Sequence, residues 1–191
     1  MHQDSGNFKN DANEYFAAIE TLTNTEGVFY PIHDFQNKPT GIIVASYENI
    51  PEHGHITSFS YGLSAANHEE WTASTPELMI SVKSNLSDWG LAMGEIILHK
   101  RFESLFTIGQ IIDFKASISA DSGMDAFFVF FSSLLEKEDA QVHLKRPLPV
   151  SLKQLYPIYT SEIPLITEIG IEDFFAKSDI DFFDVQREPK R

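Results

Sequence analysis

An uninterrupted apolar run, Phe127 to Phe131, constrains the fold more than any other stretch of this 191-residue sequence. Because successive side chains of a strand point to opposite faces, this run makes a strand that is apolar on both faces. Such a strand has to be covered on both sides, as the central strands of a layered sheet are. The preceding ADSG segment suits a tight turn from an earlier strand. The run therefore predicts a sheet with elements packed on each face.

The rest of the sequence reads as more strands than helices, and short turns join most of the strands. This pattern predicts an α+β fold with a mixed, mostly antiparallel sheet flanked by helices. Residues 1–10 are polar and are predicted to be disordered, and residues 11–191 are predicted to form a single domain. Helices are expected over 11–22, 87–103 and 161–178, the last broken at Gly170, and strands over 27–32, 41–48, 55–63, 76–83, 110–119 and 124–131, with shorter extended segments at 142–145 and 149–159.

The formal net charge is −14, from 28 acidic and 14 basic residues. Such a charge repels phosphate backbones, so the sequence argues against nucleic-acid binding. It favours capture of a basic protein partner, although a general acidic character for solubility explains the same number. The chain has no cysteine, which excludes thiolate metal sites and cysteine nucleophiles. No apolar run approaches the length of a membrane span and the start has no signal-peptide pattern, so a cytoplasmic protein is expected.

The stretch IPEHGHITSFSYGLS, residues 50–64, holds the strongest candidate for chemistry. His53 and His55 lie two residues apart beside Glu52, and on a strand both histidines would point the same way. One hypothesis is therefore a metal-dependent enzyme, although a catalytic zinc needs three protein ligands. The alternative is that Pro51 and the histidines form the entry turn of a core strand. Ser64 lacks the G-x-S-x-G pattern of a hydrolase, and no cofactor-binding motif is present.

The same stretch, followed by PELMISV at 76–82, closely resembles the Suppressor of Fused family, and DWG, ISADSGMDAFFVF and LYPIYTSEI resemble its bacterial branch. The resemblance runs from Gly41 to Val185. It implies a Suppressor of Fused-like domain, and the signature positions are read as structural. These positions are Pro51, Glu52, His53, His55, Gly62, Leu63, Ser64, Pro76, Glu77 and Leu78.

The family resemblance implies a protein-binding module that is not an enzyme and needs no cofactor. The animal member is a two-domain repressor that holds a transcription factor through a short peptide, and this chain has the length of the motif-bearing domain alone. Many bacterial members are regarded as immunity proteins that neutralise toxins of polymorphic toxin systems. The expected function is therefore an immunity protein, and the alternative is a general peptide-binding or regulatory module without a toxin partner.

Two acidic segments are the candidates for partner binding. LLEKEDA carries Glu136, Glu138 and Asp139 in a connection that follows the apolar strand, and DIDFFDV carries Asp179, Asp181 and Asp184 near the end of the sequence. Acidic groups at a rim speed association, and buried aromatic groups dominate affinity. The phenylalanines of DIDFFDV are open to a second interpretation, in which they pack the tail on the domain.

Overall fold

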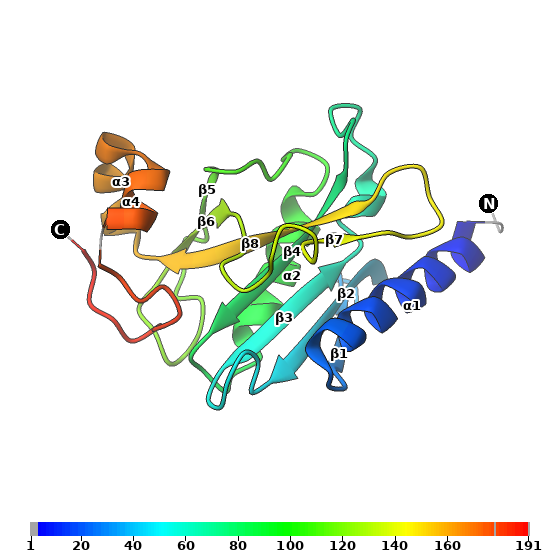
Figure 1. Ribbon diagram of the computed structural model, residues 1–191, viewed down its shortest axis with the longest axis horizontal. Helices are drawn as coiled ribbons and strands as arrows, with labels where there is room; N and C mark the ends of the chain where they lie inside the picture. The colour runs from blue at the N-terminus through cyan, green and yellow to red at the C-terminus, as the bar shows by residue number, and fades with distance from the viewer. Residues whose placement is uncertain (1–3, 178, 191) are drawn as a thin grey trace.

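The computed structural model describes residues 4–177 and 179–190, and its strands form one eight-stranded sheet (Figure 1). The spatial order is β1-β2-β3-β4-β8-β6-β5, and β7 pairs with β8 outside this path. Neighbours pair antiparallel except β4 and β8, which run parallel, so the mixed, mostly antiparallel α+β prediction is confirmed. The strands are β1 (Val28–His33), β2 (Pro39–Glu48), β3 (Ile56–Tyr61), β4 (Thr75–Val82), β5 (Ile111–Asp113), β6 (Ala126–Phe130), β7 (Gln141–Val142) and β8 (Val150–Ile158).

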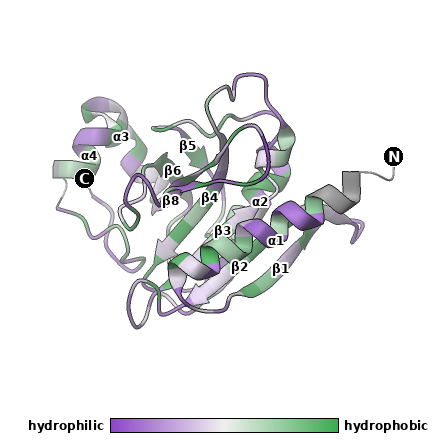
Figure 2. Ribbon diagram, turned by 45° about the vertical axis from the view of Figure 1, so that its right-hand side comes forward, coloured by the Kyte–Doolittle hydropathy of each residue, from purple (hydrophilic) through white to green (hydrophobic). Residues whose placement is uncertain are grey.

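The helices lie on both faces of the sheet, as Figures 1 and 2 show. One face is covered by α2, and the other by α1 over the β1 side and by α3 and α4 over the β6 side. Gly170 lies between α3 and α4 with φ of 85°, which breaks the helical tail where the sequence predicted. The helices are α1 (Asp4–Thr23), α2 (Asp88–Lys100), α3 (Ile163–Ile169) and α4 (Ile171–Lys177), with short 3₁₀ turns η1 (Ser64–Ala66) and η2 (Thr160–Glu162).

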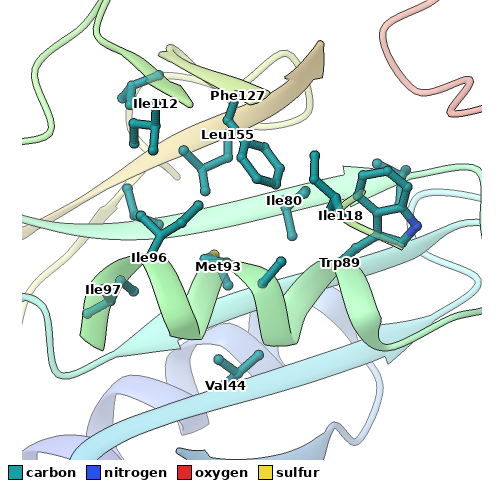
Figure 3. Close-up of a cluster of buried hydrophobic side chains, with 14 of the residues drawn as sticks. Val44, Ile80, Trp89, Met93, Ile96, Ile97, Ile112, Ile118, Phe127 and Leu155 are labelled. Carbon is teal, nitrogen blue, oxygen red and sulfur yellow. The ribbon is translucent and has the colours of Figure 1, made fainter. Parts of the chain in front are cut away.

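The α2 face holds the largest apolar core (Figure 3). Trp89 and Met93 come from α2 and are fully buried against strand residues such as Ile80. The helix lies so close to the sheet that a Cβ built on Gly90 would meet the Ser58 hydroxyl oxygen at 2.5 Å. Close approach of this kind requires glycine at that position.

The apolar run that constrained the fold forms β6, between β8 and β5. Phe127 faces the α2 core, and Phe128 faces the opposite core beneath α3 and α4; both rings are fully buried. The prediction of a strand covered on both faces is confirmed for these residues. Phe131 lies just past the end of β6 and is 65% exposed.

The helix α1 begins at Asp4, so the prediction of a disordered segment over residues 1–10 is wrong for residues 4–10. Residues 1–3 lie outside the described part of the chain. The physical reason is that the apolar stripe of the helix extends a turn further than its polar sequence indicated. The Phe8 ring packs on Tyr61 of β3, with ring centres 5.2 Å apart, and continues the row that Ala12 and Tyr15 form on the sheet.

The strand predicted over 110–119 is also too long, because β5 ends at Asp113. Lys115 has a φ of 64°, and its backbone N–H donates to the Asp113 carboxylate at 2.8 Å. An aspartate that accepts from the backbone two residues on favours a turn over continued strand pairing.

Candidate functional site

The Glu77 carboxylate is the most elaborately bound polar group on the sheet. The antiparallel pairing of β3 with β4 stops at Phe59 and Met79, and the side chain of Glu77 continues it. Its two oxygens accept from the hydroxyls of Ser60 and Ser64, at 2.6 and 2.7 Å. They also accept three backbone N–H groups, those of Gly62, Leu63 and Ser64, at 2.8, 3.3 and 2.9 Å. We call these five residues the Glu77 cluster.

The Glu77 cluster explains why several signature residues occur together. The Glu77 side chain is fully buried, and a buried carboxylate has to be hydrogen-bonded to be tolerated. Gly62 has a φ of 117°, and a Cβ there would meet the Gly41 carbonyl oxygen at 2.3 Å, so only glycine fits. Leu63 and Leu78 are fully buried in the α2 core. The cluster therefore ties the end of β3 to β4 through one buried side chain.

Arg146 extends the Glu77 cluster toward the surface. Its Nη1 donates to the Ser64 hydroxyl at 3.2 Å, and its Nη2 donates to the Thr75 hydroxyl at 2.8 Å. One serine hydroxyl thus joins the guanidinium to the buried carboxylate. The half-buried guanidinium also lines a hollow of about 400 Å³, together with Phe8, Asp11 and Tyr61.

The histidine pair does not have the geometry that motivated the metal hypothesis. Both histidines precede β3, and they differ in environment: His53 is exposed, whereas His55 is 4% exposed. The His55 ring packs edge-on against Phe183 at 5.8 Å, and its Nδ1 lies 3.9 Å from the Glu52 carboxylate. Among the described residues, no three histidine or carboxylate side chains converge on a point where they could hold a metal ion. Pro51 and the histidines form the entry turn of β3, as the alternative interpretation had it.

A groove lies between α1 and the segment that follows β6, and it is the candidate for partner contact that the acidic segment borders. Two hollows, of about 280 and 420 Å³, share Leu22 of α1 and Asp139 of the segment. The apolar side chains of Phe59, Met79 and Leu135 line the first hollow. Leu22 is 36% exposed at the groove. We call this feature the α1 groove; its rim includes Glu138 and Asp139.

Two residues of the first acidic segment, Glu138 and Asp139, line the α1 groove, and Glu136 lies outside that lining. Glu136, Glu138 and Asp139 are all exposed, and none of their carboxylates forms an ion pair within the described part of the chain. Pro51, a signature residue, also lines the groove. The three carboxylates are thus available to an approaching cation.

The second acidic segment is a packed tail. Phe182 is only 7% exposed and stacks on Phe175, with ring centres 4.8 Å apart. Asp181 forms an ion pair with Lys83 at the end of β4. The packing interpretation of this phenylalanine is therefore the one that the structure supports. Asp179 is exposed and Asp184 is half-buried, with its carboxylate accepting the Gln186 N–H at 2.9 Å.

A second buried carboxylate, not predicted from the sequence, holds this tail. Glu162 is fully buried, and the guanidinium of Arg187 donates to both oxygens of the Glu162 carboxylate, at 2.6 and 2.8 Å. The backbone N–H groups of Tyr159 and Lys190 donate to the same carboxylate. The signal available in the sequence was a group of basic residues, Arg187, Lys190 and Arg191, after an acidic segment, and it does not identify the partner of Arg187.

Comparisons with known proteins are consistent in family and fold. The model of a family described as Suppressor of fused protein (SUFU) matches residues 37–188. No curated protein matches the chain.

No helix in the described ranges has the length and apolar character needed to cross a bilayer.

Three solved structures share the fold at low sequence identity. A crystal structure described as a SUFU homolog from Neisseria gonorrhoeae FA 1090 has a TM-score of 0.73 at 12% identity, covering 95% of this chain and 97% of that one. A chain in the crystal structure of the Sufu–Fu complex has a TM-score of 0.68 at 11% identity, with 93% and 91% covered. Drosophila Suppressor of Fused has a TM-score of 0.56 at 14% identity, and the match spans 77% of this chain and 42% of that protein. At these identities the structures establish the fold alone.

Proposed function

This chain belongs to the Suppressor of fused family, and on that basis we propose that it is a non-enzymatic protein-binding module whose partner docks at the α1 groove. A chain of the same fold occurs in the Sufu–Fu complex, which supports a binding role. The observation that carries the proposal is a groove that has leucine side chains in its lining and unpaired carboxylates at its rim.

The groove favours a basic partner that presents a large apolar side chain. Leu22, Leu134 and Leu135 are partly exposed in the lining, and a partner side chain that packs on them is removed from water. Glu136, Glu138 and Asp139 would attract lysine or arginine residues around it, and the net charge of −14 would speed the encounter. Charge complementarity of this kind sets specificity and association rate more than affinity.

The finer proposal is that the partner is a toxin of a polymorphic toxin system and that this chain is its immunity protein. A strongly acidic inhibitor can cover the basic active site of a nuclease toxin by complementary potential. The alternative is a regulatory module that binds a peptide without a toxin partner. The two differ in one outcome: only an immunity protein restores growth to cells that express the toxin domain encoded beside its gene.

The experiment compares two charge-reversal variants in affinity capture from the native cell extract, followed by association kinetics with the captured protein. One variant carries Glu136→Lys, Glu138→Lys and Asp139→Lys at the groove. The control carries Glu69→Lys, Glu70→Lys and Glu103→Lys, three exposed residues outside the groove lining that undergo the same charge change.

The groove variant is expected to bind the captured protein at least about tenfold more slowly than the control, with a weaker salt dependence. Equal association rates for the two variants would refute docking at the groove. Failure of a captured neighbouring toxin to be neutralised in the growth assay would refute the immunity role and leave the binding role intact.

A further inference from the structure

The hollow that Arg146 lines lies at the opposite end of α1 from the α1 groove, where the beginning of that helix and the loop before β8 come to the same end of the sheet (Figure 1). It has a volume of about 400 Å³, at the lower end of the range for small-molecule sites. Two aromatic rings line it, Phe8 and Tyr61, and so do two opposite charges, Asp11 and Arg146. We call it the Asp11–Arg146 pocket. It shares no lining residue with the α1 groove.

The two charges in this pocket are half-buried and unpaired. In the described part of the chain, Asp11 and Arg146 form no ion pair with each other or with a third residue. The guanidinium directs two of its five N–H groups at acceptors, the hydroxyls of Ser64 and Thr75, and both acceptors are uncharged. Its Nε is buried without a hydrogen-bond acceptor.

Asp11 and Arg146 line the same hollow as Tyr61. Burial raises the pKa of the Tyr61 hydroxyl, the Asp11 carboxylate raises it further, Arg146 opposes that rise, and the buried Glu77 carboxylate adds a smaller increase. Within the hollow, Tyr61 therefore lies near an anion and a cation that form no ion pair with each other. A ligand that carries both a cation and an anion could bridge them.

Arg146 is also held in position before any ligand arrives. Ser64 belongs to the Glu77 cluster and donates to its buried carboxylate while it accepts from Arg146. A guanidinium fixed by neighbours loses little freedom when it binds a carboxylate, and its planar fork matches that group.

We propose that the Asp11–Arg146 pocket binds a small zwitterion of the α-amino-acid class with an aromatic or large apolar side chain. The ligand carboxylate pairs with Arg146, its ammonium pairs with Asp11, and its side chain packs against Phe8 and Tyr61. A peptide terminus carries only one of the two charges and therefore satisfies only one of the two residues.

The test is titration calorimetry at low ionic strength with L-phenylalanine and two derivatives that each remove one charge. N-acetyl-L-phenylalanine lacks the ammonium group, and L-phenylalaninamide lacks the carboxylate. We expect L-phenylalanine to bind, and each derivative to bind about tenfold more weakly or worse. No heat of binding from L-phenylalanine up to about 10 mM, or equal affinity for all three compounds, would overturn the proposal.

Two variants test the residue assignments. Asp11→Asn is expected to weaken L-phenylalanine about tenfold and to leave N-acetyl-L-phenylalanine unchanged, because that derivative no longer presents a cation. Arg146→Gln is expected to weaken the binding of L-phenylalanine about tenfold and to leave the binding of L-phenylalaninamide unchanged, because that derivative has no carboxylate. Glu103→Gln and Lys115→Gln, both exposed and outside the pocket lining, are the matched controls.

Arg146 also supports the Glu77 cluster, so its variant is compared with wild type by thermal unfolding first. Asp11→Asn is not expected to disturb the fold, since the Asp11 carboxylate has no hydrogen-bond partner among the described residues. If Arg146→Gln fails to fold, the Asp11→Asn variant decides the test. Loss of affinity for both L-phenylalanine and its N-acetyl derivative in Asp11→Asn would refute the ammonium assignment.

Discussion

Glu77→Gln is the sharpest test of what holds β3 and β4 together beyond their last paired residues. The amide keeps the shape of the side chain but removes the charge and turns one acceptor into a donor. The glutamine amide can take two orientations. In the better one, the amide oxygen accepts from the Gly62 and Ser64 donors, and the amide nitrogen lies near the Ser60 hydroxyl and the Leu63 N–H. The Leu63 N–H then loses its acceptor.

The expected cost follows from these contacts. One charge-assisted hydrogen bond is lost, at about 1.5–3 kcal/mol, and the others lose their charge, so the free energy of unfolding should fall by about 2–4 kcal/mol. Glu77→Ala should be worse, because three buried N–H groups are left without acceptors at about 1–3 kcal/mol each. That loss is comparable with the whole stability of a typical domain, about 5–15 kcal/mol.

Urea unfolding at pH 7 measures both variants, with Glu138→Gln as the control. Glu138 is exposed and unpaired in the described part of the chain, so the same chemical change there should stay within about 0.5 kcal/mol of wild type. If the free energy of unfolding of Glu77→Gln also stays within about 0.5 kcal/mol of wild type, at an unchanged dependence on denaturant concentration, the charge of the buried carboxylate does not stabilise the fold and the reasoning is refuted.

Four further predictions follow from the packing and the charges. Phe128→Ala should cost about 3–5 kcal/mol in urea unfolding, because it removes a fully buried ring; a change near zero would contradict the burial. Arg187→Ala should cost about 3–5 kcal/mol by the same assay, because it leaves Glu162 buried without its cation, whereas an unchanged midpoint would mean that the pair adds nothing. Burial raises the pKa of Tyr156 to about 12, against a partial lowering by Ser133, so that the folded state holds its proton more tightly than the unfolded state does. Stability should therefore fall as pH rises from about 10 to about 12, and Tyr156→Phe should flatten that fall in denaturation measured across this range. His55→Ala should lower the midpoint of thermal unfolding and leave the zinc content unchanged, and stoichiometric zinc that disappears with the mutation would revive the metal hypothesis.

The parts of the fold that were predictable are those whose signal is local. Period-two alternation located β3, and the run that is apolar on both faces at Phe127 and Phe128 located β6, because successive side chains of a strand point to opposite faces of the sheet. The start of α1 was missed because its first turns are polar, and a single phenylalanine, Phe8, did not mark the contact that it makes with Tyr61 of the sheet. The strand that begins at Ile111 is shorter than predicted, because Asp113 forms a turn that the apolar pattern did not reveal.

The candidate sites depended on contacts between distant residues, which no spacing encodes. Among 28 acidic residues, nothing in the sequence singles out Glu77 and Glu162 as the fully buried ones, except that Glu77 falls in a family signature. Arg146 reaches Ser64 from 82 residues away along the chain. The acidic tail shows the same limit: the sequence left open whether Phe182 contacts a partner or packs on the domain, and tertiary packing buries the ring.

The parallel pairing of β4 with β8 has a consequence for how the chain is made. Thr75 pairs with Val150, so the partner of β4 is synthesised 75 residues later. At a translation rate of about 5–20 residues per second, β4 waits about 4–15 s before β8 leaves the ribosome. During this interval one edge of an otherwise buried strand has no neighbour, and such an edge can pair with another nascent chain. Slow or crowded synthesis should therefore lower the soluble yield of this protein even when the finished fold is stable.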